Sequence, residues 1–155
     1  TILREVLAAA EILERDYGVP ADVCSITSFS ELRRDALECE RWNLLHPAER
    51  PRVPYVQELL GGSDTPVVAA TDYMRLVPDQ IRQWIRGPYV TLGTDGFGRS
   101  DARAELRAHF EVDRRFVVLA ALQALAGAGQ IDRQTVVAAV TKLGIDPAKP
   151  DPLNN

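Results

Sequence analysis

The chain has 155 residues, of which 46% are hydrophobic and 26% charged, and it carries a net charge of −4 at pH 7. This length and composition indicate one ordinary globular domain. The negative charge and the scattered basic residues argue against binding to nucleic acid or to an anionic membrane, because both require basic patches.

The sequence shows no apolar run of the roughly 18 residues that a membrane span requires, and it shows no signal peptide. Cys24 and Cys39 lack the close spacing of a zinc motif. Two reduced thiols are typical of a cytoplasmic protein, which is the location we predict. The chain starts at Thr1 inside a helical pattern, so we expect it to be part of a longer polypeptide.

Apolar residues recur at helical spacing over residues 1–17 and predict the first helix. Gly18 ends this helix, and Pro20 prevents it from resuming. The apolar run at residues 22–27, which includes Cys24, predicts a short buried strand.

A second helix begins at Ser28. Ser28 and Glu31 have the spacing of a capping box, in which each side chain bonds the backbone amide of the other residue. We expect this helix to run to about Leu44 and to end at His46, before Pro47.

Three prolines predict an irregular segment at residues 47–54. A short helix is expected at residues 55–60, closed by the glycines at 61–62. The apolar residues 66–71 form the most strand-like run of the chain.

Pro78 disfavours a helical residue before it, so the next helix is expected at residues 79–85. Residues 89–92 predict a third strand. After a glycine-rich turn, Ser100 or Asp101 is expected to cap the following helix, because both side chains accept from free amides of a first helical turn.

Asp113 is the predicted N-cap of a strongly apolar helix over residues 114–128. Asp132 is the predicted cap of a last helix that runs through Leu143. Three prolines in residues 146–155 predict a mobile or loosely docked C-terminal tail.

Strands that alternate with helices predict an α/β fold with a mostly parallel sheet. The strands are short and apolar, as expected when helices cover both faces of the sheet in a three-layer α/β/α arrangement. We place three strands within this chain and divide it into a domain at residues 1–145 and a tail at residues 146–155.

The turn after the third predicted strand reads G-x-x-G-x-G, at Gly93, Gly96 and Gly98. Glycines after a strand can cradle a phosphate on backbone amides. This spacing differs from the dinucleotide fingerprint, however, and no Lys-Ser/Thr pair of a P-loop follows. A tight turn is the favoured interpretation, with positive φ at one of the three glycines or more.

Asp72, Asp95 and Asp101 follow the ends of predicted strands, where α/β folds place ligands. They form the most site-like cluster of the sequence, although capping and turn formation explain them more simply. Arg75 and Arg99 are candidates to pair with these aspartates and hold the loops together.

The histidines and tryptophans each leave two interpretations open. A catalytic role for His46 would need a partner group in space, and a helix-end residue bonded to the backbone is the simpler interpretation. His109 lies among charged residues, where exposure to solvent is at least as good an explanation. Trp42 and Trp84 suit either an interface or the core.

The thiols and the paired glutamates offer no catalytic group. A packed thiol is expected for Cys24. Cys39 lies between Glu38 and Glu40, where negative charge raises the pKa of a thiol. The two glutamates are two residues apart on a helix and point in different directions, so they form no acid/base pair.

Four segments resemble the last domain of homodimeric pyruvate dehydrogenases, and a looser form of the glycine turn and helix recurs in transketolases. Together they span nearly the whole chain in the family's order. The segments are DVCSITSFSELRRDALECERWNLLHP at residues 22–47, PRVPYV at 51–56, TDYMR at 71–75 and GTDGFGRSDARAELRAHFEVD at 93–113.

The resemblance implies an enzyme that uses thiamine diphosphate and magnesium to decarboxylate pyruvate. It passes the acetyl group to a lipoyl group on the dihydrolipoyl acyltransferase component of a multienzyme complex. The family's cofactor motif is Gly-Asp-Gly followed later by Asn-Asn. This chain ends in Asn154 and Asn155, but no Gly-Asp-Gly precedes them, and the stretch from Gly127 to Gly129 lacks the aspartate.

The resemblance therefore implies that thiamine diphosphate and magnesium bind upstream of this chain. It assigns no catalytic, cofactor-binding or metal-binding residue to residues 1–155. The implied role of this domain is structural, in support of a homodimer.

In the family's last domain, an upstream strand lies between the first two of the three strands predicted here. The resemblance thus implies that residues 66–71 pair in parallel with residues 89–92, while residues 22–27 pair with neither. A chain with that gap exposes apolar strand edges, which favour aggregation, and is expected to fold poorly alone.

Three functions remain open at this point. The chain is the C-terminal domain of a pyruvate dehydrogenase, a freestanding α/β module that binds a ligand through loop 93–101, or an interaction domain that recruits a component of a multienzyme complex.

Overall fold

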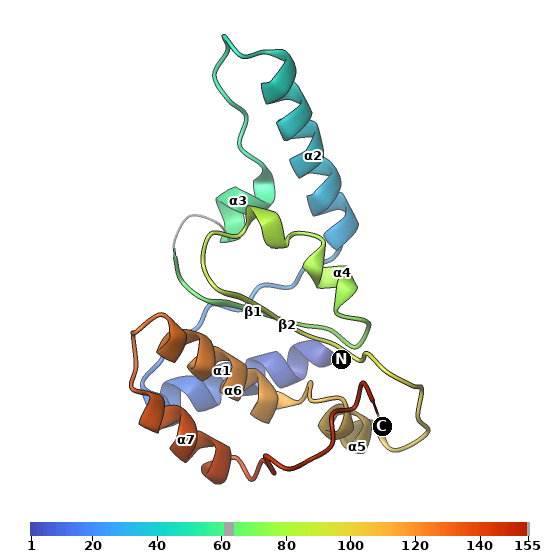
Figure 1. Cartoon of the computed structure of the whole chain (residues 1–155), viewed down its shortest axis with the longest axis vertical. Helices are drawn as coiled ribbons and strands as arrows, with labels where there is room; N and C mark the ends of the chain where they lie inside the picture. The colour runs from blue at the N-terminus through green and yellow to red at the C-terminus, as the bar shows by residue number, and fades with distance from the viewer. Residues whose placement is uncertain (61–63, 155) are drawn as a thin grey trace.

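Two short parallel strands lie at the centre of the molecule, between two groups of helices (Figure 1). Strand β1 (Val67–Ala70) pairs with β2 (Tyr89–Leu92), with Val67 opposite Tyr89 and Ala70 opposite Leu92. The structure is a computed structural model, and it describes residues 1–60 and 64–154. The predicted parallel pairing of residues 66–71 with residues 89–92 is confirmed.

Helices account for most of the regular structure in the described residues. They are α1 (Ile2–Tyr17), α2 (Phe29–Leu45), α3 (Tyr55–Leu60), α4 (Leu76–Asp79), the 3-10 helix η1 (Arg82–Trp84), α5 (Arg103–His109), α6 (Arg114–Gly127) and α7 (Arg133–Lys142). The predicted closure of α3 by glycines 61–62 lies outside the described residues.

Helices α1, α6 and α7 cover one face of the sheet. Their apolar sides form a core around Leu13, Val118 and Leu122. Val68 and Ala70 of β1 pack against this core, because successive side chains of a strand point to opposite faces.

A second core lies on the other face, between the sheet and α2, α3 and η1. Ile81, Trp84 and Val56 are buried there, and Val67 and Ala69 pack against them. The chain is therefore an α/β domain with helices on both faces of a small parallel sheet, as predicted.

Residues 22–27 do not form the predicted strand, so the described residues hold two strands and not three. An extended segment becomes a strand only when its backbone amides and carbonyls find a ladder partner, and this segment pairs with neither strand. The prediction that Cys24 packs in a buried strand is wrong as well, because Cys24 is exposed.

The edge of β1 that faces away from β2 is open within the described residues. Val67 N donates to Pro88 O at 2.8 Å, and Thr71 N donates to Leu92 O at 2.9 Å. By alternation, the amides of Val68 and Ala70 point to the other side, and no hydrogen bond from them joins another described segment. All four residues of β1 are only half-buried.

The predicted helix at residues 79–85 is replaced by two short elements, α4 and η1. Pro78, which was expected to precede a helix, lies inside α4. Proline is tolerated there because the amides of a first helical turn have no acceptor within the helix. The carbonyl oxygen of Pro78 accepts a hydrogen bond from the buried hydroxyl of Tyr89, at 2.8 Å.

Three predicted helix caps are confirmed. Ser28 Oγ accepts from Glu31 N at 3.2 Å, while Asp113 and Asp132 accept from amides of the first turns of α6 and α7. The reciprocal half of the capping box is absent from the described contacts, because the Glu31 carboxylate pairs with Arg34.

Helix α5 begins later than predicted. Its N-cap is Ala102, whose side chain accepts no hydrogen bond from the first turn. Among the described residues, the Asp101 carboxylate accepts a hydrogen bond only from the adjacent Ala102 N, at 2.8 Å. The prediction of a cap at Ser100 or Asp101 is therefore wrong.

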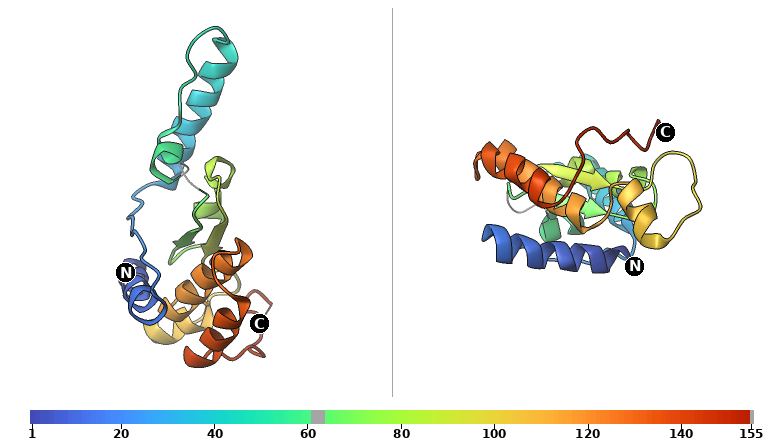
Figure 2. Two further views of the ribbon diagram at one scale, coloured as in Figure 1. Left: turned by 90° about the vertical axis from the view of Figure 1, so that its left-hand side faces the viewer. Right: turned by 90° about the horizontal axis from the view of Figure 1, so that it is seen from below.

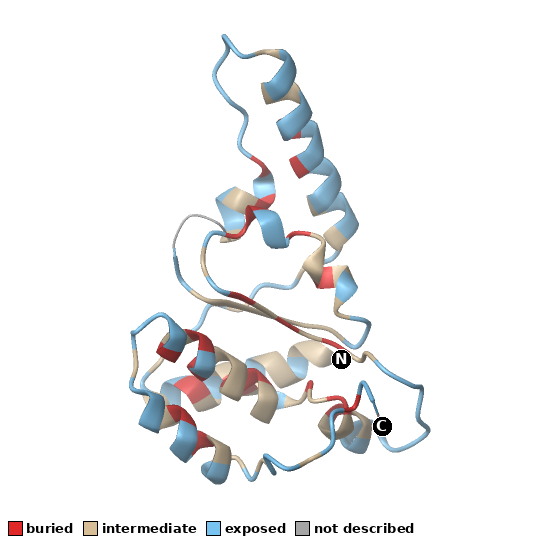
Figure 3. Ribbon diagram, in the orientation of Figure 1, coloured by how far each residue is buried: buried red, intermediate tan, exposed pale blue. Residues whose placement is uncertain are grey.

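Helix α2 and the segment that returns to α3 project from the body of the molecule as an arm (Figures 1 and 2). Most of the arm is exposed (Figure 3). Three large apolar side chains of the arm are exposed, Leu44 at 78%, Leu45 at 54% and Val53 at 52%, as is Tyr55 at the start of α3, at 56%.

The segment after α7 returns to the region of α5 (Figure 1). Lys149 Nζ donates to His109 O at 2.7 Å and to Glu111 Oε1 at 3.0 Å, and Pro152 is buried. The division into a domain at residues 1–145 and a tail at residues 146–155 stays a prediction.

Candidate functional site

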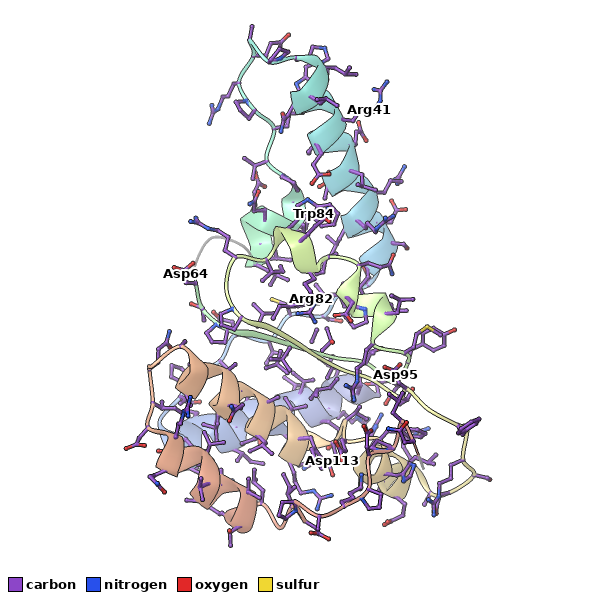
Figure 4. All side chains as sticks on the ribbon, in the orientation of Figure 1. Arg41, Asp64, Arg82, Trp84, Asp95 and Asp113 are labelled. Carbon is purple, nitrogen blue, oxygen red and sulfur yellow. The ribbon has the colours of Figure 1, made fainter. Side chains whose placement is uncertain are left out.

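The parallel pairing brings the two strand-end aspartates to the same edge of the sheet. Asp72 follows β1, and Asp95, labelled in Figure 4, follows β2. The two loops are joined by a hydrogen bond from Thr94 N to Tyr73 O of 2.9 Å. The loops of Asp72 and Asp95 thus lie together, whereas the described contacts of Asp101, the third member of the predicted cluster, are confined to Ala102 N.

Asp72 is engaged in contacts within the fold. Arg107 Nε and Nη2 donate to its two carboxylate oxygens at 3.1 and 2.8 Å, and Ile2 N donates at 3.1 Å. The Arg107 side chain is only 10% exposed and also lies 3.7 Å from Glu5. A bidentate pair of this kind fixes both side chains, so Asp72 ties α1 to α5.

Asp95 also serves the fold. Its Oδ1 accepts from Arg75 N at 3.0 Å, and Arg75 Nε lies 3.6 Å from Oδ2. The predicted pairing of Arg75 with a strand-end aspartate is confirmed. At 3.6 Å the Nε contact is an ion pair and not a hydrogen bond, so this buried nitrogen has no hydrogen-bond acceptor among the described residues.

The glycine turn adopts positive φ at one position, as predicted. Gly96 has φ of +112°, whereas Gly93 and Gly98 do not have positive φ. A Cβ at Gly93 would lie 2.6 Å from Tyr73 O, so glycine is needed there because the two loops approach closely. Gly98 has open space around it.

A cavity of about 420 Å³ lies between this turn and α5. The exposed Arg99 and Arg103 line it together with the Asp72–Arg107 pair. Its complete lining is Asp72, Thr94, Gly96, Gly98, Arg99, Arg103, Leu106, Arg107 and Phe110. The sequence analysis singled out Arg99 but not Arg103, Arg107 or the apolar lining residues, because their pattern is that of an ordinary helix face.

His46 is a helix-end residue bonded to the backbone, as the simpler interpretation holds. Its Nδ1 lies 2.9 Å from Trp42 O, and its ring stacks on Trp42 with centroids 3.6 Å apart. Arg52 covers the same indole at 3.5 Å. His109 is half-buried against the edge of Phe110. Neither histidine meets a nucleophile within the described contacts.

Cys39 of α2 is buried, and burial raises the pKa of its thiol, with a further contribution from Asp35. A raised pKa keeps the sulfur protonated and unreactive. Cys24 is exposed.

Trp84 belongs to the core and not to an exposed interface. It is buried, and its Nε1 donates to Glu40 Oε1 at 2.8 Å across α2 and η1 (Figure 4). The Glu40 carboxylate thus accepts a hydrogen bond from the Trp84 indole and does not pair with Glu38. Trp42 is half-buried under Arg52 and His46.

Within residues 1–60 and 64–154, no group of three or more histidine, cysteine or acidic side chains is placed to hold a metal ion. None of the described helices is long and apolar enough to cross a membrane. Asn155 of the terminal Asn-Asn pair lies outside the described residues.

One charged cluster was not predicted. Glu5 of α1 accepts from the backbone amide and the guanidinium of Arg114 at 3.1 and 2.9 Å, more than a hundred residues away in the sequence. The Arg114 guanidinium holds the pKa of Glu5 below its usual value. A single acidic residue on an amphipathic helix gives no signal of such a partner.

Comparison with known proteins identifies the relatives of this chain. It is 58% identical to the pyruvate dehydrogenase E1 component of Pseudomonas aeruginosa over 99% of the chain and 18% of the relative. It is 55% identical to the protein of that name from Escherichia coli K12, over 98% of the chain and 17% of the relative. The Cupriavidus necator protein of the same name is 51% identical over 99% of the chain and 17% of the relative.

The chain thus spans less than a fifth of the length of these relatives. The model of the transketolase-like TK C-terminal domain matches residues 1–113, which include both strands, the glycine turn and α5. Because this match covers well over half of the sequence, the chain belongs to the family of transketolase-like C-terminal domains.

Proposed function

We propose that this chain is the C-terminal domain of a pyruvate dehydrogenase E1 component. In the proposed complete enzyme, pyruvate is decarboxylated and the acetyl group is passed to the lipoyl group of a dihydrolipoyl acyltransferase. The observation that carries the proposal is 58% identity to a pyruvate dehydrogenase E1 component over 99% of this chain.

The side chains of this chain do not fit the cofactor that the family implies. A diphosphate held through magnesium needs carboxylate or carbonyl oxygens that converge on the metal. The aspartates nearest to such an arrangement, Asp72 and Asp95, are engaged by Arg107 and Arg75. We infer that thiamine diphosphate and magnesium bind to upstream domains. We assign no catalytic role to residues 1–155.

The role proposed for this domain is architectural. Its arm exposes Leu44, Leu45 and Val53, and exposed apolar side chains on a projecting element suit burial against another protein surface. We infer that the arm packs against the rest of the enzyme and supports a homodimer. We also infer a cytoplasmic location, together with the acyltransferase component.

The proposal is tested by comparing the complete polypeptide with residues 1–155 alone. With pyruvate, thiamine diphosphate and magnesium, the complete polypeptide is expected to release carbon dioxide and to acetylate an added lipoyl domain. The 155-residue chain is expected to do neither. Reactions without thiamine diphosphate serve as the control.

Two results would contradict the proposal. Cofactor-dependent release of carbon dioxide by residues 1–155 alone would place the catalytic machinery in this chain. A complete polypeptide that binds thiamine diphosphate but acetylates no lipoyl domain would remove the assigned reaction.

A further inference from the structure

The cavity beside the glycine turn has a positive lining in an acidic protein. Three guanidinium groups and one carboxylate line it, whereas the whole chain has a net charge of −4. Local excess charge inside a concave site concentrates ions of opposite sign. The lining therefore favours an anion over a cation or a neutral molecule.

The three arginines differ in how far they are engaged. Arg107 is fixed by its bidentate pair with Asp72 and is 10% exposed. Arg99 and Arg103 are exposed, and neither makes a hydrogen bond or an ion pair within residues 1–60 and 64–154. These two guanidinium groups thus keep all their donors available for a ligand.

The remaining lining suits an organic molecule and not a bare ion. Leu106 and the buried Phe110 supply apolar surface, while Thr94 supplies a hydroxyl group. A Cβ at Gly98 would meet nothing within 4 Å, so the backbone there is open to approach. A volume of about 420 Å³ lies in the range of small-molecule sites.

We propose that this cavity binds an organic phosphate monoester. Its phosphate lies between Arg99 and Arg103, and its organic part lies over Leu106 and Phe110. A phosphate monoester carries close to two negative charges at neutral pH, which matches two unengaged guanidinium groups. Arginine recognises phosphate through paired donors.

The test uses the complete polypeptide with thiamine diphosphate and magnesium at saturation, so that phosphate binding at the cofactor site does not interfere. Phenyl phosphate is the probe, and phenol and inorganic phosphate are the comparison ligands. Hydrogen–deuterium exchange of peptides spanning residues 93–110 reports binding at this cavity and not elsewhere. A titration of this protection gives the apparent Kd.

Phenyl phosphate is expected to slow exchange in these peptides, and phenol is expected to have no effect. Inorganic phosphate is expected to bind more weakly than phenyl phosphate. The double variant Arg99→Gln/Arg103→Gln is expected to raise the apparent Kd for phenyl phosphate at least about tenfold. The matched control Arg133→Gln, an exposed arginine of α7, should leave the Kd unchanged.

Three outcomes overturn the proposal. They are an unchanged Kd in the double variant, protection by phenol equal to that by phenyl phosphate, and inorganic phosphate binding as tightly as phenyl phosphate. Protection from exchange is measured at residues 93–110. A failure of phenyl phosphate to bind there would not contradict the assignment as a pyruvate dehydrogenase domain. Conversely, a loss of enzyme activity would not test the binding of phenyl phosphate to this cavity.

Discussion

At the scale of single residues, three glycines in one turn are needed to very different degrees. Gly96 has φ of +112°, and a Cβ there would lie 2.5 Å from Pro152 O. Gly93 has ordinary φ, but it lies against the backbone of Tyr73. Gly98 has neither constraint. The sequence shows three identical residues, and only the surroundings of each distinguish them.

Replacing Gly96 with alanine should destabilise the domain by about 1 kcal/mol or more, because alanine is strained at positive φ. The new methyl group also displaces the C-terminal segment at Pro152. Urea unfolding measures the change. Gly98→Ala is the matched control and should be neutral or slightly stabilising. Equal losses in the two variants would show that this account of the turn is wrong.

Replacing Asp113 with alanine should cost about 1 kcal/mol, because Asp113 accepts from Arg115 N and Phe116 N at the start of α6. Ser100→Ala is the matched control, since Ser100 does not cap α5. Thermal unfolding compares the two variants. A loss at Ser100 as large as that at Asp113 would contradict the assignment of the caps.

At the scale of elements, a charged cluster joins α1, α5 and α6. Glu5 of α1 binds Arg114 at the start of α6, and Arg107 of α5 lies 3.7 Å from Glu5 while it holds Asp72. Glu5 and Arg107 are largely buried, at 14% and 10% exposure. Paired buried charges fix the register of elements that apolar contacts alone leave free to slide.

Replacing Glu5 with glutamine should destabilise the domain by about 1 kcal/mol at neutral pH, because it removes the hydrogen bonds to Arg114. The pKa of Glu5 is lowered from its usual 4.5, chiefly by Arg114. The contribution of Glu5 is therefore fully present above pH 4.5 and is lost as the pH falls through the lower folded pKa.

Urea unfolding of the wild type and Glu5→Gln at a series of pH values measures this difference. It should shrink steadily as the pH falls below 4.5. Glu14→Gln, an exposed position of the same helix, is the control and should show no such dependence. A difference that stays constant down to pH 2 would exclude Glu5 as the titrating group.

At the scale of the whole molecule, two surfaces look incomplete. The outer edge of β1 leaves the amides of Val68 and Ala70 without partners among the described residues. Leu44, Leu45 and Val53 on the arm are exposed and belong to neither core. Both features suit a domain that packs against further protein, as the proposed function requires.

The 155-residue chain alone is expected to associate or aggregate, because an open apolar strand edge templates pairing between copies. Size-exclusion chromatography with light scattering measures its state, and the complete polypeptide provides the comparison. The complete polypeptide should give a single defined oligomer. A stable, monodisperse monomer of residues 1–155 would revive the freestanding module as the function.

The sequence alone determined most of the local structure. Hydrophobic periodicity located α1, α2, α6 and α7, and capping side chains marked the start of α2, α6 and α7, because these signals lie within a few residues. Motif order indicated the family that the comparison then established. The residue-level chemistry also correctly indicated that Cys39 is an inert thiol.

Only the tertiary structure decided what depends on contacts between distant segments. Residues 22–27 have the composition of a strand, yet a strand exists only where a neighbour completes its ladder. Pro78 sits inside a helix because its position in the first turn makes the missing amide harmless. The cavity joins residues from the loops after both strands and from α5, and the Glu5 cluster joins residues more than a hundred positions apart. Local sequence does not indicate which distant side chains the fold brings together.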